Sequence, residues 1–261
     1  MSRAGYYKGK KQKVKKICFD KQIISQVLKI RQEQPCIGSK KLYHLLFEEL
    51  HKGDQKLGRD RFHRLLSEYK LLVRRKRRHV HTTNSHHRFY TYGNLLKTKK
   101  INSPEQVYVA DITYLRTHKG FVYLFLLTDA YSRKIMGWNV SNSLGIEGGI
   151  KALKMALKNT KRPTGVIHHS DRGIQYCSHV YTDLIKKNNM NISMTEENHC
   201  YENAIAERVN GILKQEFFLD SEWPDCNSVI RAVRESVEIY NTKRPHWSNS
   251  LKTPEEVHQA A

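Results

Sequence analysis

Three acidic residues in the second half of the chain have the type and placement that could bind divalent cations. Asp111 lies within the apolar run 107–115, Asp171 follows a second apolar run at 166–170, and Glu207 lies in a segment of helical periodicity. Three carboxylates that converge from separate elements repel one another and are costly to bury unpaired. Oxygen ligands of this kind suit Mg²⁺ or Mn²⁺ better than zinc. Two such ions, about 3.5–4 Å apart, would flank a phosphodiester and support phosphoryl transfer without a covalent protein intermediate.

A structural alternative exists for the same residues, in which they form ordinary ion pairs with the neighbouring Arg172 and Arg208. The other acidic residues have simpler interpretations. Asp129 precedes a turn, and Asp183 falls on a helix surface. The placement of the three candidate ligands therefore depends on the elements that carry them.

The elements after residue 104 are predicted in the order βββαβαβα. Strands are expected at 107–115, 121–128, 134–140, 166–170 and 191–194, with helices at 146–159, around 180–185 and at 203–217. This order is that of the ribonuclease-H-like α/β fold, with a mixed five-stranded sheet between helices. In that topology the first and fourth strands are neighbours, which brings Asp111 and Asp171 together. Glu207 shares one helical face with Asn203 and Lys214.

Positive charge is concentrated in the N-terminal part of the chain. The 261 residues carry a net charge of +21, and residues 1–100 contain 27 Lys and Arg against 7 Asp and Glu. Such crowding indicates a polyanionic partner, and nucleic acid is the usual one.

Residues 1–18 are predicted to be a basic, flexible N-terminus, disordered until bound. Residues 19–73 are predicted to form three short helices with a basic third member, which resembles a helix-turn-helix. A plain three-helix bundle is the alternative.

Residues 74–103 are predicted to be a basic linker, since the five consecutive cations Arg74, Arg75, Lys76, Arg77 and Arg78 cannot pack into a core. Tyr90 and Tyr92 could stack against bases. Four nearby histidines suggest zinc only weakly, because no paired cysteines follow them. The five cysteines are widely spaced and form no CxxC pair, which favours a reducing cytoplasm. No apolar run approaches the ~20 residues of a membrane span, so no membrane partner is expected.

Four segments carry a resemblance to a known family: ADITYL (110–115), HSDRGIQY (169–176), SMTEENHCYENAIAERVNGILKQE (193–216) and YNTKRPH (240–246). They resemble the DDE transposases of bacterial insertion sequences, most closely the second-frame products of the retroviral-integrase superfamily. The match is collinear over roughly residues 20–257. Mapped by residue, Asp111, Asp171 and Glu207 take the positions of the catalytic and metal-binding triad.

The resemblance implies Mg²⁺-dependent nicking at the element's ends, with two ions per site and Mn²⁺ as a substitute. The freed 3′-hydroxyl then attacks a phosphodiester, joining the terminal repeats to target DNA. It also implies a homo-multimer on DNA ends in the bacterial cytoplasm, associated with the nucleoid when bound. A first-frame protein of the same element is an expected partner, because nothing in these 261 residues resembles it.

Further DNA contacts are proposed from charge and position. In the helical region these are Arg59, Arg61 and Arg64, in the linker the five cations, and beyond it Arg172, Lys214, Lys243 and Arg244. Residues 104–220 form the expected catalytic core. Residues 221–261 are expected to form a helical extension that braces this core, with Thr253-Pro254 and Glu256 opening a final helix through a capping box.

Two rival functions use the same residues differently. A basic repressor would bind DNA and keep its carboxylates for structure. A nuclease of the same fold would hydrolyse nucleic acid without joining ends, since water and a 3′-hydroxyl can use the same metal site.

Overall fold

The computed structural model describes residues 3–52, 56–73, 89–97, 99–196 and 203–260. The chain divides into two compact units, residues 1–77 and residues 78–261. Each unit has its own hydrophobic core and is considered separately. Among the described residues, no helix is both long enough and apolar enough to cross a membrane.

The larger unit is built on a mixed sheet of five strands in the order β3-β2-β1-β4-β5. Strands β1 (Val107–Thr117), β2 (Gly120–Asp129) and β3 (Ile135–Ser141) form an antiparallel meander, and β4 (Ile167–Ser170) and β5 (Asn191–Met194) continue the sheet in parallel. The predicted ribonuclease-H-like layout is therefore confirmed, including the adjacency of the first and fourth strands.

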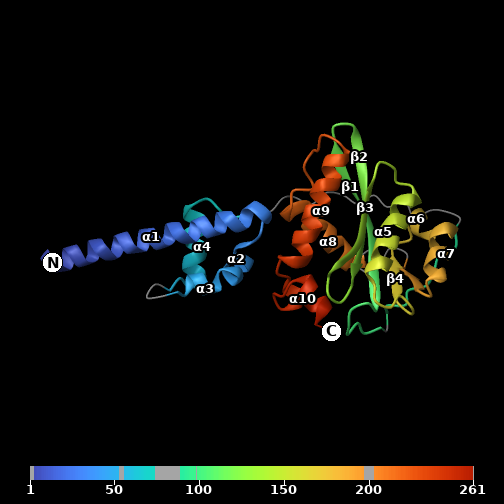
Figure 1. Cartoon of the computed structure of the whole chain (residues 1–261), viewed down its shortest axis with the longest axis horizontal. Helices are drawn as coiled ribbons and strands as arrows, with labels where there is room; N and C mark the ends of the chain where they lie inside the picture. The colour runs from blue at the N-terminus through green and yellow to red at the C-terminus, as the bar shows by residue number, and fades with distance from the viewer. Residues whose placement is uncertain (1–2, 53–55, 74–88, 98, 197–202, 261) are drawn as a thin grey trace. The chain divides into compact units, whose positions relative to one another are not determined.

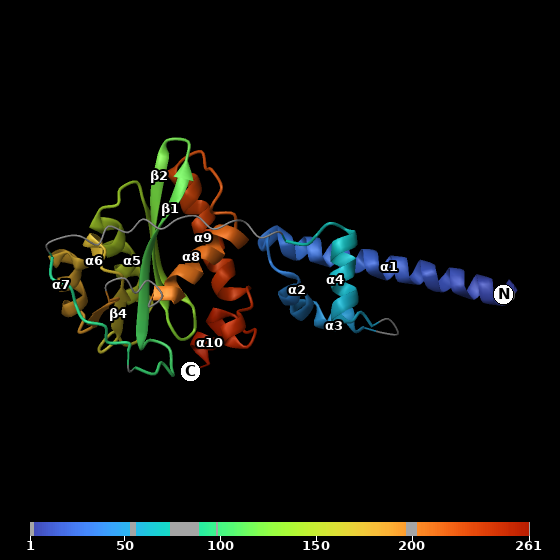
Figure 2. The ribbon, with the colours of Figure 1, turned by 180° about the vertical axis from the view of Figure 1, so that it is seen from behind.

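Helices cover both faces of this sheet (Figures 1 and 2). On one side lie α5 (Ile146–Asn159), α6 (Ile174–Cys177) and α7 (His179–Lys187), and on the other lie α8 (Ala204–Glu216) and α9 (Cys226–Thr242). Alternate residues of a strand point to opposite faces. Phe125 and Leu127 of β2 accordingly pack in the core beneath α5 and α7, whereas Leu124 and Leu126 pack beneath α8 and α9.

Two glycines allow α5 to approach the sheet closely. A Cβ atom at Gly137 of β3 would collide with the backbone of Ala152 and Ala156 in α5. A Cβ atom at Gly148 would collide with the ring of Phe125. The helix therefore lies against the strands at a separation that larger residues would not permit.

The C-terminal region packs against the core through α9, a 3₁₀ turn at Trp247–Asn249 and α10 (Pro254–Gln259). The amide of Asn241 bonds both backbone groups of Ile135, at 2.9 and 3.0 Å, and so joins α9 to the start of β3. The capping box of Thr253 and Glu256 is present at α10, as the sequence predicts.

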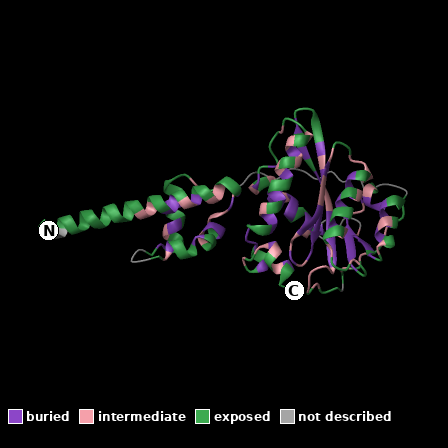
Figure 3. Cartoon of the chain, in the orientation of Figure 1, coloured by how far each residue is buried: buried purple, intermediate pink, exposed green. Residues whose placement is uncertain are grey.

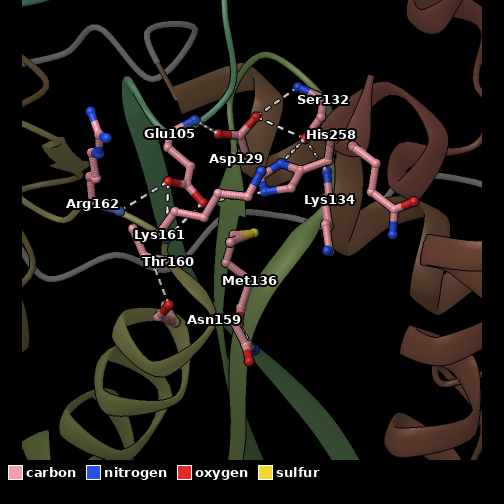
Figure 4. A network of polar contacts seen from close by, with 12 residues as sticks. Glu105, Asp129, Ser132, Lys134, Met136, Asn159, Thr160, Lys161, Arg162 and His258 are labelled. Atoms are coloured by element: carbon pink, nitrogen blue, oxygen red, sulfur yellow. Dashed lines mark hydrogen bonds and ion pairs between the residues drawn. The ribbon is translucent and has the colours of Figure 1, made fainter. Parts of the chain in front are cut away.

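A polar network fixes α10 to the end of the sheet (Figure 4). Asp129 is fully buried and accepts hydrogen bonds from the backbone of Glu105, Tyr131 and Ser132 and from the Ser132 hydroxyl. The same hydroxyl lies 3.1 Å from Nδ1 of His258, whose Nε2 lies 3.5 Å from Glu105. Asp129 is thus a turn residue, as predicted, and the turn it closes is also the docking point of α10.

The described residues of the N-terminal unit form four helices: α1 (Arg3–Glu33), α2 (Ser39–Leu45), α3 (Phe47–Leu50) and α4 (Arg59–Glu68). Ile23, Val27, Leu42, Phe62 and Leu66 are among the residues of its core. One of the three helices predicted for residues 19–73 is divided at Leu46 into α2 and α3, and Leu45 is 36% exposed.

The expectation of a flexible segment at residues 1–18 is corrected by the structure, since residues 3–18 continue the helix that holds the core residues of α1. The physical reason is composition: the segment has no proline, and Lys and Gln are good helix formers. Asp20, inside α1, accepts a hydrogen bond from Arg61 of α4 at 3.1 Å.

The predicted linker is only partly described, because residues 74–88, with all five consecutive cations and the four histidines, lie outside the described residues. The part that follows packs on the larger unit. Tyr92 contacts the core under α5 and α7, and its ring lies 5.0 Å from that of Tyr90. Leu96 and Ile101 pack beside β1, and the backbone of Leu95 donates to Ser193 of β5.

Candidate active site

Two of the three predicted metal ligands lie side by side because of the sheet register. Strand β1 pairs in parallel with β4, and Val109 lies opposite His169. Asp111 and Asp171 each follow this pair by two residues, and neighbouring strands are about 4.8 Å apart. Asp111 is in the middle of β1, while Asp171 lies just beyond the end of β4. The adjacency that the sequence predicts is thus built into the sheet.

The carboxyl group of Asp111 is in an unusual electrostatic environment. Burial raises its pKa to about 7, and the negative charges of Asp171 and, more weakly, Glu207 act in the same direction. Two hydrogen bonds oppose this shift: the amide of Asn210 donates to Oδ2 at 2.7 Å, and the backbone of Ile112 donates to Oδ1 at 2.9 Å. Burial and the neighbouring carboxylates thus oppose the ionisation of Asp111, whereas the two hydrogen bonds favour it.

Helix α8 carries the third acid. Glu207 is in its first turn and is exposed, and Asn210 and Lys214 follow on the same face at spacings of three and seven residues. Desolvation lowers the pKa of Lys214, while the charges of Asp220 and Asp111 raise it. Lys214 is therefore close enough to Asp111 to interact with it. Asn203, which the sequence places on the helical face of Glu207, is buried and donates to the carbonyl of Ala110 at 3.0 Å.

Asn210 is the functional residue that sequence reasoning missed. Its side chain is buried, and its donation to Asp111 holds that carboxylate against α8. The signal was available, because a residue three positions after Glu207 lies on the same helical face.

The donor chemistry of the site fits a hard divalent cation. All three candidate ligands are carboxylates, and the repulsion that raises the pKa of Asp111 is the kind that a bound cation removes. Within the described parts of the chain, no group of three or more His, Cys, Asp or Glu side chains is already arranged to hold an ion. Glu207 contributes the weakest of the effects on the pKa of Asp111, and its side chain is exposed.

The residues around Asp171 have mainly structural contacts. The guanidinium of Arg172 donates to the carbonyl of Thr195 at 2.8 Å, and the amide of Gln175 donates to Leu144 at 3.1 Å. Asp171 itself accepts from the backbone of Gly173 at 3.0 Å. Nδ1 of the buried His169 bonds the hydroxyl of Ser193 at 2.8 Å. The loop after β4 is therefore tied to β5 and to the residues before α5.

The predicted DNA contacts of α4 differ in exposure. Arg59 and Arg64 are exposed, whereas Arg61 is partly buried and bonded to Asp20. Beyond the core, Lys243 is exposed at the end of α9.

Arg244 is not available as a DNA contact, which corrects the prediction for this residue. It is 2% exposed, and Nε and Nη2 bond both carboxylate oxygens of Glu216 at 2.8 and 2.7 Å. Its guanidinium also lies 5.6 Å from the ring centre of Tyr240. The bidentate ion pair links the segment after α9 to the end of α8. Because the guanidinium is buried and bonded to Glu216, it cannot also bind a phosphate.

Comparison with known proteins adds independent findings. Residues 101–200 and 188–254 match two family models, each described as an integrase core domain. The chain is 35% identical over 269 residues to the insertion element IS600 uncharacterized 31 kDa protein of Shigella sonnei, covering 100% of this chain and 97% of that protein.

A second relative is named for its activity. The transposase InsF for insertion sequence IS3A of Escherichia coli (strain K12) is 38% identical over 157 residues, which cover 59% of this chain and 54% of the transposase. The chain thus aligns with about half of that relative. Among solved structures, the simian T-cell lymphotropic virus intasome in complex with PP2A regulatory subunit B56 gamma contains a chain that matches with a TM-score of 0.52 at 17% identity. The match covers 86% of this chain and 72% of that one, and at this identity it supports the fold alone.

Proposed function

Since the chain belongs to the DDE transposases of bacterial insertion sequences, in the integrase superfamily, we propose that it cleaves DNA strands at the ends of its element and transfers them to target DNA. The observation that carries the proposal is the closeness of Asp111, in β1, to Asp171, which directly follows the adjacent parallel strand β4; helix α8, which bears Glu207, contacts β1 through Asn210. A protein that only bound DNA would gain nothing from two repelling carboxylates at a half-buried position.

The proposed cofactor is Mg²⁺, two ions per site, with Mn²⁺ as a substitute, held by Asp111, Asp171 and Glu207. When bound, the ions would activate the attacking oxygen and stabilise the leaving one.

The other side chains of the site have supporting roles in this proposal. Asn210 donates to Oδ2 of Asp111 and the backbone of Ile112 donates to Oδ1, so each oxygen keeps a further lone pair for a ligand. Lys214, on the face of Glu207, supplies a positive charge for a DNA phosphate close to the reacting bond. Asp111 acts as a ligand only when it is deprotonated, because a protonated carboxyl group is a poor donor to a cation.

The proposed substrate is DNA at the terminal repeats of the element and in the target. The exposed Arg59 and Arg64 on α4 and the basic residues at 74–78 would bind its backbone, with Arg172 and Lys243 as further candidates. Joining two ends requires two active sites in one complex, so a homo-multimer on DNA is part of the proposal. A first-frame protein of the same element is the proposed additional partner.

The test is a strand-transfer assay with purified protein. Labelled duplexes that carry the two ends of the element are incubated with plasmid target and Mg²⁺, and the products are separated on denaturing and native gels. We expect nicked ends and joined end–target products, both of which are lost in Asp171→Ala. Asp183→Ala is the matched control, because it removes an exposed carboxylate from α7 away from the site.

The rival functions give different products. Cleavage without joined products would replace the proposal with a nuclease. Binding of the duplexes without any cleavage, unchanged in Asp171→Ala, would replace it with a repressor.

A further inference from the structure

Helix α8 has a glycine near its middle that the packing of the described chain does not explain. Gly211 is the eighth residue of this 13-residue helix. A Cβ atom at Gly211 would meet no atom of the described residues within 4 Å, its own helical turn and chain neighbours excepted. Its φ is not positive, so the backbone conformation does not require glycine either. A glycine inside a helix lowers the folding equilibrium constant by about fivefold relative to alanine.

The glycines of α5 differ from Gly211 in this respect. A Cβ atom at Gly148 would collide with the ring of Phe125, and one at Gly149 would contact the ring of Tyr181 at 3.4 Å. Those two glycines permit the close packing of α5 on the sheet. Gly211 permits no such packing within the described residues, so the space beside it is open to a molecule from outside the chain.

Gly211 lies on the part of α8 that carries the charged residues of the site. Helices α8 and α9 each have one buried side and one exposed side (Figure 3). With about 100° of rotation for each residue, Gly211 lies one turn after Glu207 and about 40° from it around the axis. Arg208 and Lys214 lie about 60° away on either side, the first exposed and the second partly exposed. The open position is therefore next to a candidate metal ligand and flanked by two cations.

We propose that Gly211 gives clearance to the DNA strand being cleaved, so that its sugar–phosphate backbone lies directly against α8 beside Glu207. This inference rests on the proposed function and assigns a further substrate-contacting residue to it. The scissile phosphate has to lie at the ions that Glu207 helps to hold. One turn of helix rises about 5.4 Å, so the nucleotide next to that phosphate comes within reach of Gly211.

The surroundings of Gly211 favour DNA over a second copy of the chain as the occupant. Arg208 and Lys214 provide positive charge on both sides of the open position, which suits a phosphate backbone. The reaction itself also brings a DNA strand to Glu207, whereas a protein surface would have to complement two cations and a carboxylate at once. A side chain at position 211 would hold the strand away from the helix by about the size of a methyl group or more.

The test is a substitution series at Gly211 in the full chain. Gly211→Ala adds one methyl group and Gly211→Leu adds a larger side chain, and both residues are better helix formers than glycine. Gly9→Ala is the matched control, because Gly9 lies inside α1 of the other unit and a Cβ atom there also meets nothing within 4 Å. Single-turnover cleavage of an end duplex is measured with Mg²⁺ at saturating DNA, and DNA affinity is measured by fluorescence anisotropy.

We expect the cleavage rate to fall by about tenfold in Gly211→Ala and about 100-fold in Gly211→Leu, because a misplacement of about 1 Å can cost a factor of about 100. The affinity for DNA should change by less than about threefold, since most of the DNA-binding surface is unaltered. Gly9→Ala should cleave at the rate of the unaltered protein. A full cleavage rate in Gly211→Leu would overturn the inference.

Two measurements without DNA separate clearance for a strand from an effect on the protein itself. In urea unfolding, Gly211→Ala should be more stable than the unaltered protein, with a folding equilibrium constant about fivefold higher. The rise in Tm caused by Mg²⁺ should be the same in both proteins, because Glu207 is not displaced. A loss of stability or a smaller effect of Mg²⁺ would overturn the inference, since the substitution would then act on the helix or on the metal ligands.

Photocrosslinking identifies the occupant. With 4-thiothymidine placed in turn at nucleotides on both sides of the cut, we expect crosslinks to the segment of α8 between Arg208 and Lys214. Crosslinks confined to other segments would overturn the inference, and a lower mass of the protein–DNA complex in Gly211→Leu would then assign the space to a second copy. The unaltered protein is assayed in parallel: absence of cleavage refutes the proposed function, whereas full cleavage by Gly211→Leu refutes only this inference.

Discussion

The side-chain amide of Asn210 donates to Oδ2 of Asp111 at 2.7 Å and links α8 directly to the central strand β1. This bond favours the charged form of a carboxyl group whose pKa is otherwise raised by burial and by Asp171. Asn210 therefore has a positioning role in the site, since it orients the carboxylate and also keeps it ionisable.

Removal of this bond should move the pH dependence of the reaction. In Asn210→Ala the pKa of Asp111 rises above its value of about 7 because a bond to the charged form is lost. We expect the acidic limb of the pH–rate profile of DNA cleavage to shift upward by about one pH unit, since a hydrogen bond to a charged group contributes about 1.5–3 kcal/mol.

The matched control is Asn191→Ala, which removes an exposed amide bond to Gly165 at 3.3 Å, at the start of β5. Its profile should coincide with that of the unaltered protein. A profile of Asn210→Ala that is lowered uniformly at all pH values, without a shift, would assign Asn210 a purely structural role.

The stability of the metal-free protein should depend on the ionisation of Asp111. The carboxyl group titrates near 3.9 when unfolded and at about 7 when folded, so the folded state retains the proton more strongly. Stability contributed by the protonated form is therefore lost as pH rises from about 4 to about 7. Asp111→Asn cannot ionise and should be more stable than the unaltered protein at pH 8 by about 1–2 kcal/mol. This is less than the full pKa shift implies, because the side chain is only partly buried.

Urea unfolding at pH 4.5 and pH 8, with EDTA and with Mg²⁺, measures this effect. The two proteins should be nearly equal at the lower pH, and Mg²⁺ should stabilise only the unaltered protein. Asp183→Asn on α7 serves as the control and should be neutral at both pH values. Equal stabilisation of Asp111→Asn by Mg²⁺ would place the ion elsewhere.

The strands and helices of the larger unit can be predicted well from the sequence, because each depends on a pattern among neighbouring residues. Period-two and helical patterns define strands and helices, and the order of these elements is sufficient to place Asp111 beside Asp171. The role of Asn210 could also have been inferred, since it follows from the helical spacing to Glu207. The helical state of residues 3–18 is harder to predict, because high charge is compatible with either disorder or a solvated helix.

Arg244 illustrates what a sequence pattern does not contain. Within the segment YNTKRPH its charge suggests a phosphate contact as strongly as that of Lys243. The difference arises from tertiary packing, which places Glu216, 28 residues away in the chain, against one cation and leaves its neighbour exposed.

This contrast predicts opposite outcomes for adjacent substitutions. Arg244→Met leaves the carboxylate of Glu216 without its bidentate partner and should reduce the free energy of unfolding by about 3–5 kcal/mol. Lys243→Met should change it by less than about 0.5 kcal/mol. Chemical denaturation measures both. The double variant Arg244→Met/Glu216→Leu should recover much of the loss, because the uncompensated charge is removed; no recovery would mean that the packing of Arg244 on Tyr240 is the larger contribution.

Docking of α10 should weaken at acidic pH through His258. Its imidazole is 6% exposed, and the charged groups that surround it are Glu105, Asp129, Lys134 and Glu255. Desolvation lowers the pKa of His258 and outweighs the attraction of the three acids. A histidine with a lowered folded-state pKa contributes stability above its unfolded value of about 6.5, and this stability is lost as pH falls toward the folded-state pKa.

Hydrogen exchange of α10 amides, corrected for intrinsic rates and referenced to α9, measures this docking at pH 7.5 and pH 5.5. We expect protection of α10 to fall at the lower pH in the unaltered protein and to be independent of pH in His258→Gln. The direction separates this effect from that of Asp111, which reduces stability as pH rises. Constant protection of α10 in the unaltered protein would mean that the ion pair of protonated His258 with Glu105 compensates the cost of burying its charge.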